Sequence, residues 1–82
     1  MERKKKKKEA LARFGNRLNQ LRKEKHMSFR QLAAQCDVDH SDIKKFENGE
    51  KNITILTVIE LSIGLGVHPK ELLDFDFDFL EK

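Results

Sequence analysis

The sequence predicts a small all-α domain built from five helices. Apolar residues recur at spacings of three and four along most of the chain, and several segments begin with residues that cap helices. The whole chain has 82 residues, which is enough for one compact domain. We expect three parts: a basic N-terminal arm over residues 1–9, a helical domain over 10–74 and an acidic-aromatic tail over 75–82.

Composition excludes several classes of protein. The single cysteine, Cys36, rules out an internal disulfide framework and is typical of a reducing compartment. No apolar window is long enough to span a membrane, and the basic N-terminus lacks the apolar stretch of a secretory signal. The histidines and carboxylates show neither metal-ligand spacing nor a nucleophile motif. We therefore expect a cytoplasmic protein that is not an enzyme and has no metal or cofactor.

Charge is distributed unevenly along the chain. Residues 1–30 carry 12 Lys/Arg against 3 Glu, whereas residues 31–82 carry 5 Lys against 11 Asp/Glu. This division predicts one basic surface for a polyanion and an acidic end that faces elsewhere. The run from Arg3 to Lys8 has two interpretations: a solvated, frayed tail, or an arm that follows a phosphate backbone.

A helical pattern begins at Ala10 and fades near His26. Its apolar positions line one face at spacings of three and four, and they are Leu11, Phe14, Leu18 and Leu21.

A second helix is expected over residues 28–35. Ser28 and Gln31 have the spacing of a capping box, in which each side chain satisfies a free backbone donor. Met27 and Leu32 occupy the two positions of a hydrophobic staple.

A third helix follows after a very short turn. Asp39 can cap it, Ile43 and Phe46 form its apolar face, and Asn48-Gly49 supplies a left-handed stop. Two short helices joined by so few residues cross steeply, which is the helix-turn-helix arrangement.

Two more helices complete the domain. Thr54 opens the fourth and Gly66 closes it, while Pro69 suits the first position of a short fifth helix with Leu72 and Leu73 packing inward. The apolar residues of the fourth helix cover more than one face, so we expect it to be buried on two sides; they are Ile55, Val58, Ile59, Leu61, Ile63 and Leu65.

The tail alternates phenylalanine and aspartate from Asp74 to Phe79, which is the period of a strand. A lone strand is unstable in water, so a strand here would pair with a symmetry mate. A short helical extension and a disordered tail remain alternatives.

Four segments together resemble the phage repressor/Cro-like helix-turn-helix family, often called XRE. They are Leu21 to Lys25, Ser28 to Ala33, Ile43 to Gly49 and Leu65 to Val67. Residues 47–54 are also similar to the controller proteins of restriction-modification systems. The resemblance implies a sequence-specific regulator of transcription that binds double-stranded DNA as a homodimer on an inverted repeat.

The resemblance also implies site residues. The second helix of such a motif enters the major groove, and residues near phosphates give affinity and register. The expected DNA-binding residues are Arg30, His40, Ser41, Lys44, Lys45, Lys51 and Asn52. Arg22 and Glu47 match a semi-buried ion pair that ties the first helix to the recognition helix.

Excess apolar residues after the motif predict the dimer interface, for which the candidates are Ile59, Ile63, Phe75, Phe77 and Phe79. The alternative function is an antitoxin-like or other protein-interaction module, with the aromatic tail as the segment that docks a protein partner.

Two positions depart from the family pattern. Asp37 stands where a turn glycine is usual, and we expect it to tolerate left-handed geometry. Phe29 stands where a polar residue is usual, so a DNA contact is in doubt there, and the ring could touch a thymine methyl or a neighbouring domain instead.

Overall fold

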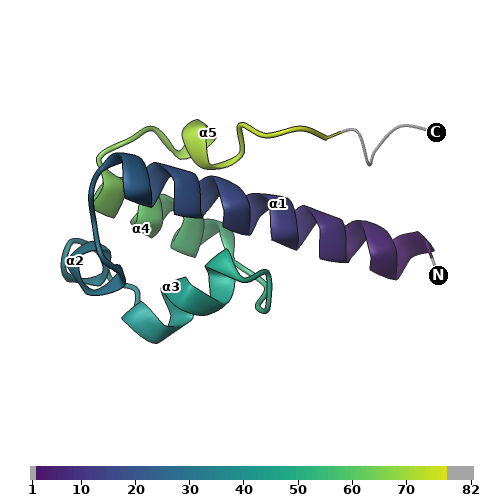
Figure 1. Ribbon diagram of the computed structural model, residues 1–82, viewed down its shortest axis with the longest axis horizontal. Helices are drawn as coiled ribbons and strands as arrows, with labels where there is room; N and C mark the ends of the chain where they lie inside the picture. The colour runs from purple at the N-terminus through teal and green to yellow at the C-terminus, as the bar shows by residue number, and fades with distance from the viewer. Residues whose placement is uncertain (1, 78–82) are drawn as a thin grey trace.

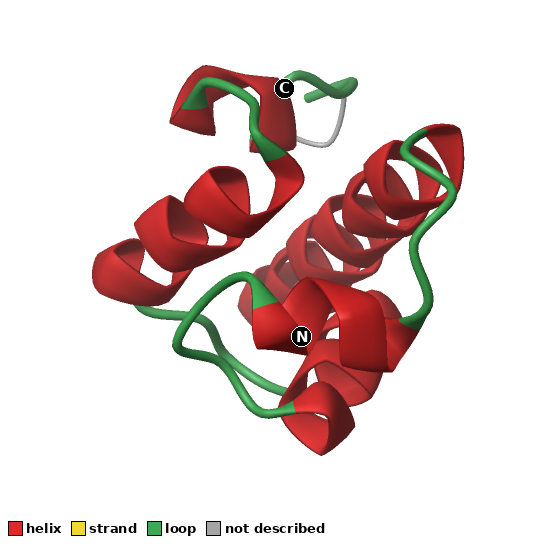
Figure 2. Cartoon of the chain, turned by 90° about the vertical axis from the view of Figure 1, so that its left-hand side faces the viewer, coloured by secondary structure: helices red, strands yellow, loops and turns green. Residues whose placement is uncertain are grey.

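The computed structural model describes residues 2–77 as an all-α fold (Figure 1). Its five helices, in chain order, are α1 (Glu2–Glu24), α2 (Phe29–Ala34), α3 (His40–Glu47), α4 (Ile55–Leu65) and α5 (Pro69–Leu72). The described residues contain no strand, as the helical periodicity predicts (Figure 2).

The helix ends lie where the capping residues predict them. Ser28 and Gln31 form the reciprocal capping box of α2, and the Asp39 side chain accepts a hydrogen bond from the Ser41 backbone at the start of α3. Thr54 caps α4 in the same way. Gly66 ends α4 with a φ of 71°, a left-handed conformation that costs glycine little.

Helix α1 begins at Glu2 rather than at Ala10. Lysine, glutamate and alanine all favour helix, and neither glycine nor proline interrupts the chain before Gly15. The expected basic arm is therefore the first two turns of a continuous 23-residue helix.

All five helices contribute to the core. Leu18, Leu32, Ile43, Leu61 and Leu72 are its fully buried side chains. Because these come one from each of the five helices, burial of a single apolar cluster fixes the whole arrangement.

Helices α3 and α5 lie on different sides of α1, and Figures 1 and 2 agree on this placement. At Gly15, α1 and α3 approach so closely that a Cβ atom there would lie 2.4 Å from the Glu47 carbonyl oxygen. The two helices can therefore pack only with hydrogen at this position.

The C-terminal region differs from the expectation in one respect. Leu72 is fully buried, but Leu73 is exposed, so the prediction that both pack inward was wrong. Adjacent residues in a helix point about 100° apart, and the four-residue α5 turns only one of them to the core. Residues 74–77 contain no strand, while the rest of the alternating segment, including Phe79, lies outside the described residues.

No residue in the turn between α2 and α3 has a left-handed backbone conformation. Within residues 2–77, His26 is the non-glycine residue with a positive φ, so the left-handed geometry that Asp37 was expected to tolerate does not occur there. The Asp37 backbone N–H instead donates to Glu60 Oε1 of α4 at 2.9 Å. This hydrogen bond ties the turn to α4, and the turn needs no glycine because Asp37 has no positive φ.

Candidate nucleic-acid interface

Helix α3 buries one face and exposes the other. Ile43, Phe46 and Glu47 are buried, whereas Ser41, Lys44 and Lys45 are exposed. Ser41 and Lys45 are four residues apart and so lie one turn apart on the outer face. Lys44 lies beside them with His40, which is half-buried at the start of the helix. We call these four residues the recognition face.

A buried ion pair fixes α3 on α1. Arg22 Nε donates to Glu47 Oε2 at 2.6 Å, and Arg22 Nη2 donates to Glu47 Oε1 at 3.0 Å. Both residues are buried, at 8% and 9% exposure. The two parallel hydrogen bonds set the rotation of the guanidinium as well as its distance from the carboxylate.

Further contacts complete this ion pair, and the resemblance did not reveal them. Asn19 Nδ2 donates to Glu47 Oε1 at 2.7 Å, and Arg22 Nη1 donates to the Met27 carbonyl at 2.7 Å. The Phe29 ring lies 4.1 Å beneath the Arg22 guanidinium carbon. Asn19 could have been found from its place three residues before Arg22 on the same helix face.

Phe29 therefore has a role inside the domain. Its ring is half-buried against the core and stacks on the Arg22 cation. This packing explains an aromatic residue where the family pattern has a polar one.

The N-terminus of α3 carries an internal hydrogen bond. Ser41 Oγ donates to Asp39 Oδ2, and the Ser41 backbone N–H donates to the same oxygen at 3.1 Å. The hydroxyl bond and then the backbone bond lower the pKa of Asp39, with smaller help from the charges of His40 and Arg30. The Ser41 hydroxyl is thus oriented in the free protein.

Basic and polar residues also flank the recognition face. Arg30 is exposed on α2, and Lys51 and Asn52 are exposed in the loop after α3. Lys51 Nζ donates to Asp42 Oδ1 at 2.9 Å, so this lysine has an acidic partner in the free chain.

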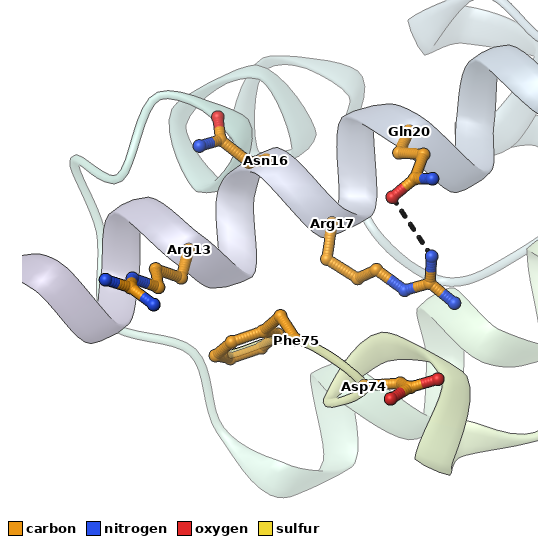
Figure 3. Close-up of a pocket in the computed structure, with 6 residues that line it drawn as sticks. All are labelled: Arg13, Asn16, Arg17, Gln20, Asp74 and Phe75. Atoms are coloured by element: carbon orange, nitrogen blue, oxygen red, sulfur yellow. Dashed lines mark hydrogen bonds between the residues drawn. The ribbon is translucent and has the colours of Figure 1, made fainter. Parts of the chain in front are cut away.

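On the other side of α1, arginines hold α5 and the residues after it (Figure 3). Arg17 Nε donates to the Glu71 carbonyl at 2.7 Å, and Arg17 Nη2 pairs with the Glu71 carboxylate at 3.2 Å. Arg13 Nη1 donates to the Asp76 carbonyl at 2.9 Å. Arg13 and Arg17 line a shallow pocket together with Asp74 and Phe75. Their hydrogen bonds hold the C-terminal segment on the side of α1 away from α3.

The expected dimerisation residues form no single described surface. Ile59 and Ile63 are exposed on α4 beside Ile55 and Leu56, which are also exposed. Phe75 is partly buried against the core and stacks on the exposed Phe77, with ring centroids 4.7 Å apart. Phe79 lies outside the described residues.

Within residues 2–77, no group of three or more His, Cys, Asp or Glu side chains is placed to hold a metal ion. None of the helices in this range is long and apolar enough to cross a membrane.

Comparison with known proteins gave consistent matches. Residues 18–72 match the family described as helix-turn-helix. The chain is 43% identical over 61 residues to control protein C.MunI of Mycoplasma sp, covering 73% of this chain and 82% of that protein. It is 40% identical over 63 residues to control protein C.BamHI of Bacillus amyloliquefaciens, covering 76% and 78%.

A solved structure also matches the fold. The restriction-modification controller protein C.AhdI from Aeromonas hydrophila superposes with a TM-score of 0.73 at 34% sequence identity. The match covers 76% of this chain and 94% of that chain.

Proposed function

We propose that this chain, which belongs to the helix-turn-helix family, performs the DNA-binding and regulatory role of a controller-type member. The chain acts as a homodimer that binds an inverted repeat in duplex DNA. Each α3 enters the major groove of one half-site. The observation that carries this proposal is the polar and basic recognition face. Its Ser41, Lys44 and Lys45 are exposed, and the buried Arg22–Glu47 pair holds it on α1.

Base recognition is assigned to the outer residues of α3. Lys45 and Lys44 donate to the O6 and N7 acceptors that guanine presents in the major groove. Ser41 lies one turn before Lys45, and its hydroxyl oxygen, whose hydrogen is already donated to Asp39, is left to accept a hydrogen bond from a base amino group. His40 contacts the groove at the edge of this face.

Phosphate contacts are assigned to the flanking residues. Arg30 at the start of α2 and Lys51 with Asn52 in the loop after α3 bracket the recognition face. Lys51 exchanges Asp42 for a phosphate when DNA binds. Contacts of this kind set affinity and register and carry little sequence information.

The exposed apolar face of α4 supports dimerisation. Ile55, Leu56, Ile59 and Ile63 expose 38% to 71% of their surface on a helix whose other face is core. Apolar residues grouped in this way on a small domain favour a subunit interface. A two-fold axis there would set the two recognition helices about 34 Å apart, on successive turns of the groove.

A second candidate function is docking of a protein partner, as in an antitoxin. Exposed Leu73 and Phe77 at the C-terminal end favour it. Co-purification with a second small protein that is lost on Phe77→Asp would support this candidate.

Selection from a random duplex pool at physiological salt tests the main proposal. Weak, charge-driven binding is suppressed under these conditions. Recovery of an inverted repeat with half-site centres about ten base pairs apart is the expected result. Recovery of no common sequence by folded protein would overturn the proposal.

A further inference from the structure

Five consecutive lysines at the start of α1, Lys4 to Lys8, have no part in the function proposed above. All five are exposed. Figure 1 shows that this end of α1 projects beyond the end of α3 and the loop that follows it. The lysines therefore sit on a regular helix with a definite position relative to the recognition face.

The loop after α3 fixes where this projection begins. Gly49 lies against Ala12, since a Cβ atom at Gly49 would be 3.2 Å from the Ala12 Cα. With a rise of about 1.5 Å per residue, Lys8 lies about 6 Å and Lys4 about 12 Å farther along the helix axis. The lysines thus continue outward from the loop that carries Lys51 and Asn52.

Helical phase places two of the lysines on the α3 side. Gly15 and Arg22 mark the face of α1 that contacts α3. At 100° per residue, Lys8 lies within about 20° of Gly15, and Lys4 lies five whole turns before Arg22. Both therefore continue the α3-facing stripe beyond the end of the domain.

Lys6 lies on the opposite face. Lys6 precedes Arg13 by seven residues and Arg17 by eleven, so its direction around the helix axis is within about 20° of theirs. Arg13 and Arg17 lie on the face of α1 that holds α5 and the residues after it (Figure 3). Lys5 and Lys7 lie between the two faces. The lysine run therefore places charges on both the α3 side and the α5 side of α1.

We propose that Lys4 and Lys8 bind phosphates of duplex DNA flanking the half-site, next to those contacted from the loop after α3. This inference rests on the proposed function, because that function sets which side of α1 faces DNA. A row of lysines on a helix offers point charges without the planar geometry that would recognise a particular group. Such residues therefore extend the length of backbone contacted and leave sequence preference unchanged.

The test compares the salt dependence of binding for two double variants that each remove two charges. Lys4→Gln with Lys8→Gln removes the proposed contacts, and Lys6→Gln with Lys70→Gln is the matched control on the α5 side. Glutamine and lysine have similar helix propensity, so α1 is retained, and circular dichroism checks this. The probe is a fluorescein-labelled 30-base-pair duplex of mixed sequence, followed by anisotropy.

Each lost phosphate contact lowers the slope of log affinity against log salt by about 0.9, so the Lys4/Lys8 variant loses about 1.8 for each bound subunit and about 3.6 for a bound dimer. Between about 50 and 200 mM salt, the affinity of the dimeric variant should then fall about 150-fold less than that of the wild type. The Lys6/Lys70 control should keep the wild-type slope. An unchanged slope for the Lys4/Lys8 variant, or an equal loss in both variants, would overturn the inference.

The duplex recovered by selection separates this inference from the proposed function. If wild-type protein selects an operator and the Lys4/Lys8 variant keeps both its preference and its salt slope, only the inference fails. If the wild type selects no operator, the proposed function fails and the inference fails with it. If the variant loses slope but keeps its preference for the operator over the mixed duplex, both stand.

Discussion

Arg22 and Glu47 show how one buried ion pair can serve a binding surface that neither residue touches. The Glu47 carboxylate accepts from Arg22 and Asn19, while Arg22 also donates to a backbone carbonyl and stacks on Phe29. No side-chain nitrogen or oxygen buried within residues 4–77 lacks a partner. Because every donor and acceptor is satisfied, the pair orients α3 without leaving a stranded charge.

Glu47→Leu should lower the free energy of unfolding by about 3 kcal/mol, because it strands the buried guanidinium. Urea unfolding measures the loss. Glu9→Gln is the control, since Glu9 pairs with Arg13 at an exposed i,i+4 position and should cost about 0.5 kcal/mol or less. Equal losses in the two variants would contradict the structural role of the buried pair.

Asp39 makes stability depend on pH in the acid range. Its pKa lies below the ordinary value chiefly because Ser41 donates to the carboxylate. A lowered folded-state pKa gives stability that is fully present above the unfolded-state pKa and is lost as pH falls through the folded-state pKa. Asp39→Asn keeps a capping oxygen but does not titrate, so its acid-side loss of stability should be shallower.

Urea midpoints measured from neutral pH down to about pH 3 check this difference. Ser41→Ala, which removes the largest cause of the shift, should behave between Asp39→Asn and the wild type. If the urea midpoints of all three proteins fall in the same way as pH is lowered, Asp39 contributes nothing to the pH dependence.

At the scale of the helices, the capping residues made most boundaries predictable. Ser28, Asp39 and Thr54 each cap the helix that the sequence assigned to them, and Gly66 ends α4. The start of α1 was not predictable in this way, because a run of lysines contains no N-cap residue and is equally consistent with a solvated arm.

Gly15 and Gly66 separate two reasons for glycine in a helical protein. Gly15→Ala introduces a Cβ against the Glu47 carbonyl, so we expect a loss of about 2 kcal/mol although alanine favours helix. Gly66→Ala meets no atom within 4 Å and strains only its positive φ, costing about 1 kcal/mol. Under conditions in which both variants are folded, Gly15→Ala should lower the affinity for DNA because it displaces α3. Gly66→Ala should leave that affinity unchanged.

Unchanged DNA affinity in folded Gly15→Ala would contradict the claim that contact with α1 positions α3. Reduced affinity in Gly66→Ala would show instead that the end of α4 matters for binding.

At the scale of the whole molecule, α4 divides its apolar residues between the core and the surface. Val58, Leu61 and Leu65 are buried, while Ile59 and Ile63 are exposed. The sequence predicted an apolar excess on this helix and named Ile59 and Ile63 as candidates for an interface, and both are exposed. The contacts of α2 and α5 with α4 account for its buried face.

Ile63→Glu should leave the monomer folded, because the side chain is 60% exposed, and should abolish dimerisation by burying a charge in the interface. Sedimentation velocity measures the subunit number. Leu73→Glu is a matched change at an exposed leucine of the C-terminal segment, and it should leave the dimer intact. A dimer that survives Ile63→Glu would place the interface elsewhere.

The residues of the candidate interface and the Arg22–Glu47 pair behind it were predictable from the sequence and its family resemblance, but the other contacts that hold them were not. The exposed lysines of α3 follow from helical phase once Ile43 and Phe46 are assigned to the core. The bond of Lys51 to Asp42 and the stacking of Phe29 on Arg22 depend on tertiary distances, which no local pattern contains.

If α3 reads bases through Lys45, parallel selections with wild-type protein and Lys45→Ala should show it. Both proteins should recover the same inverted repeat, with base preference relaxed at one position in each half-site of the variant. The variant should bind the wild-type site about 1–3 kcal/mol more weakly. Identical motifs and affinities for the two proteins would contradict base recognition by Lys45.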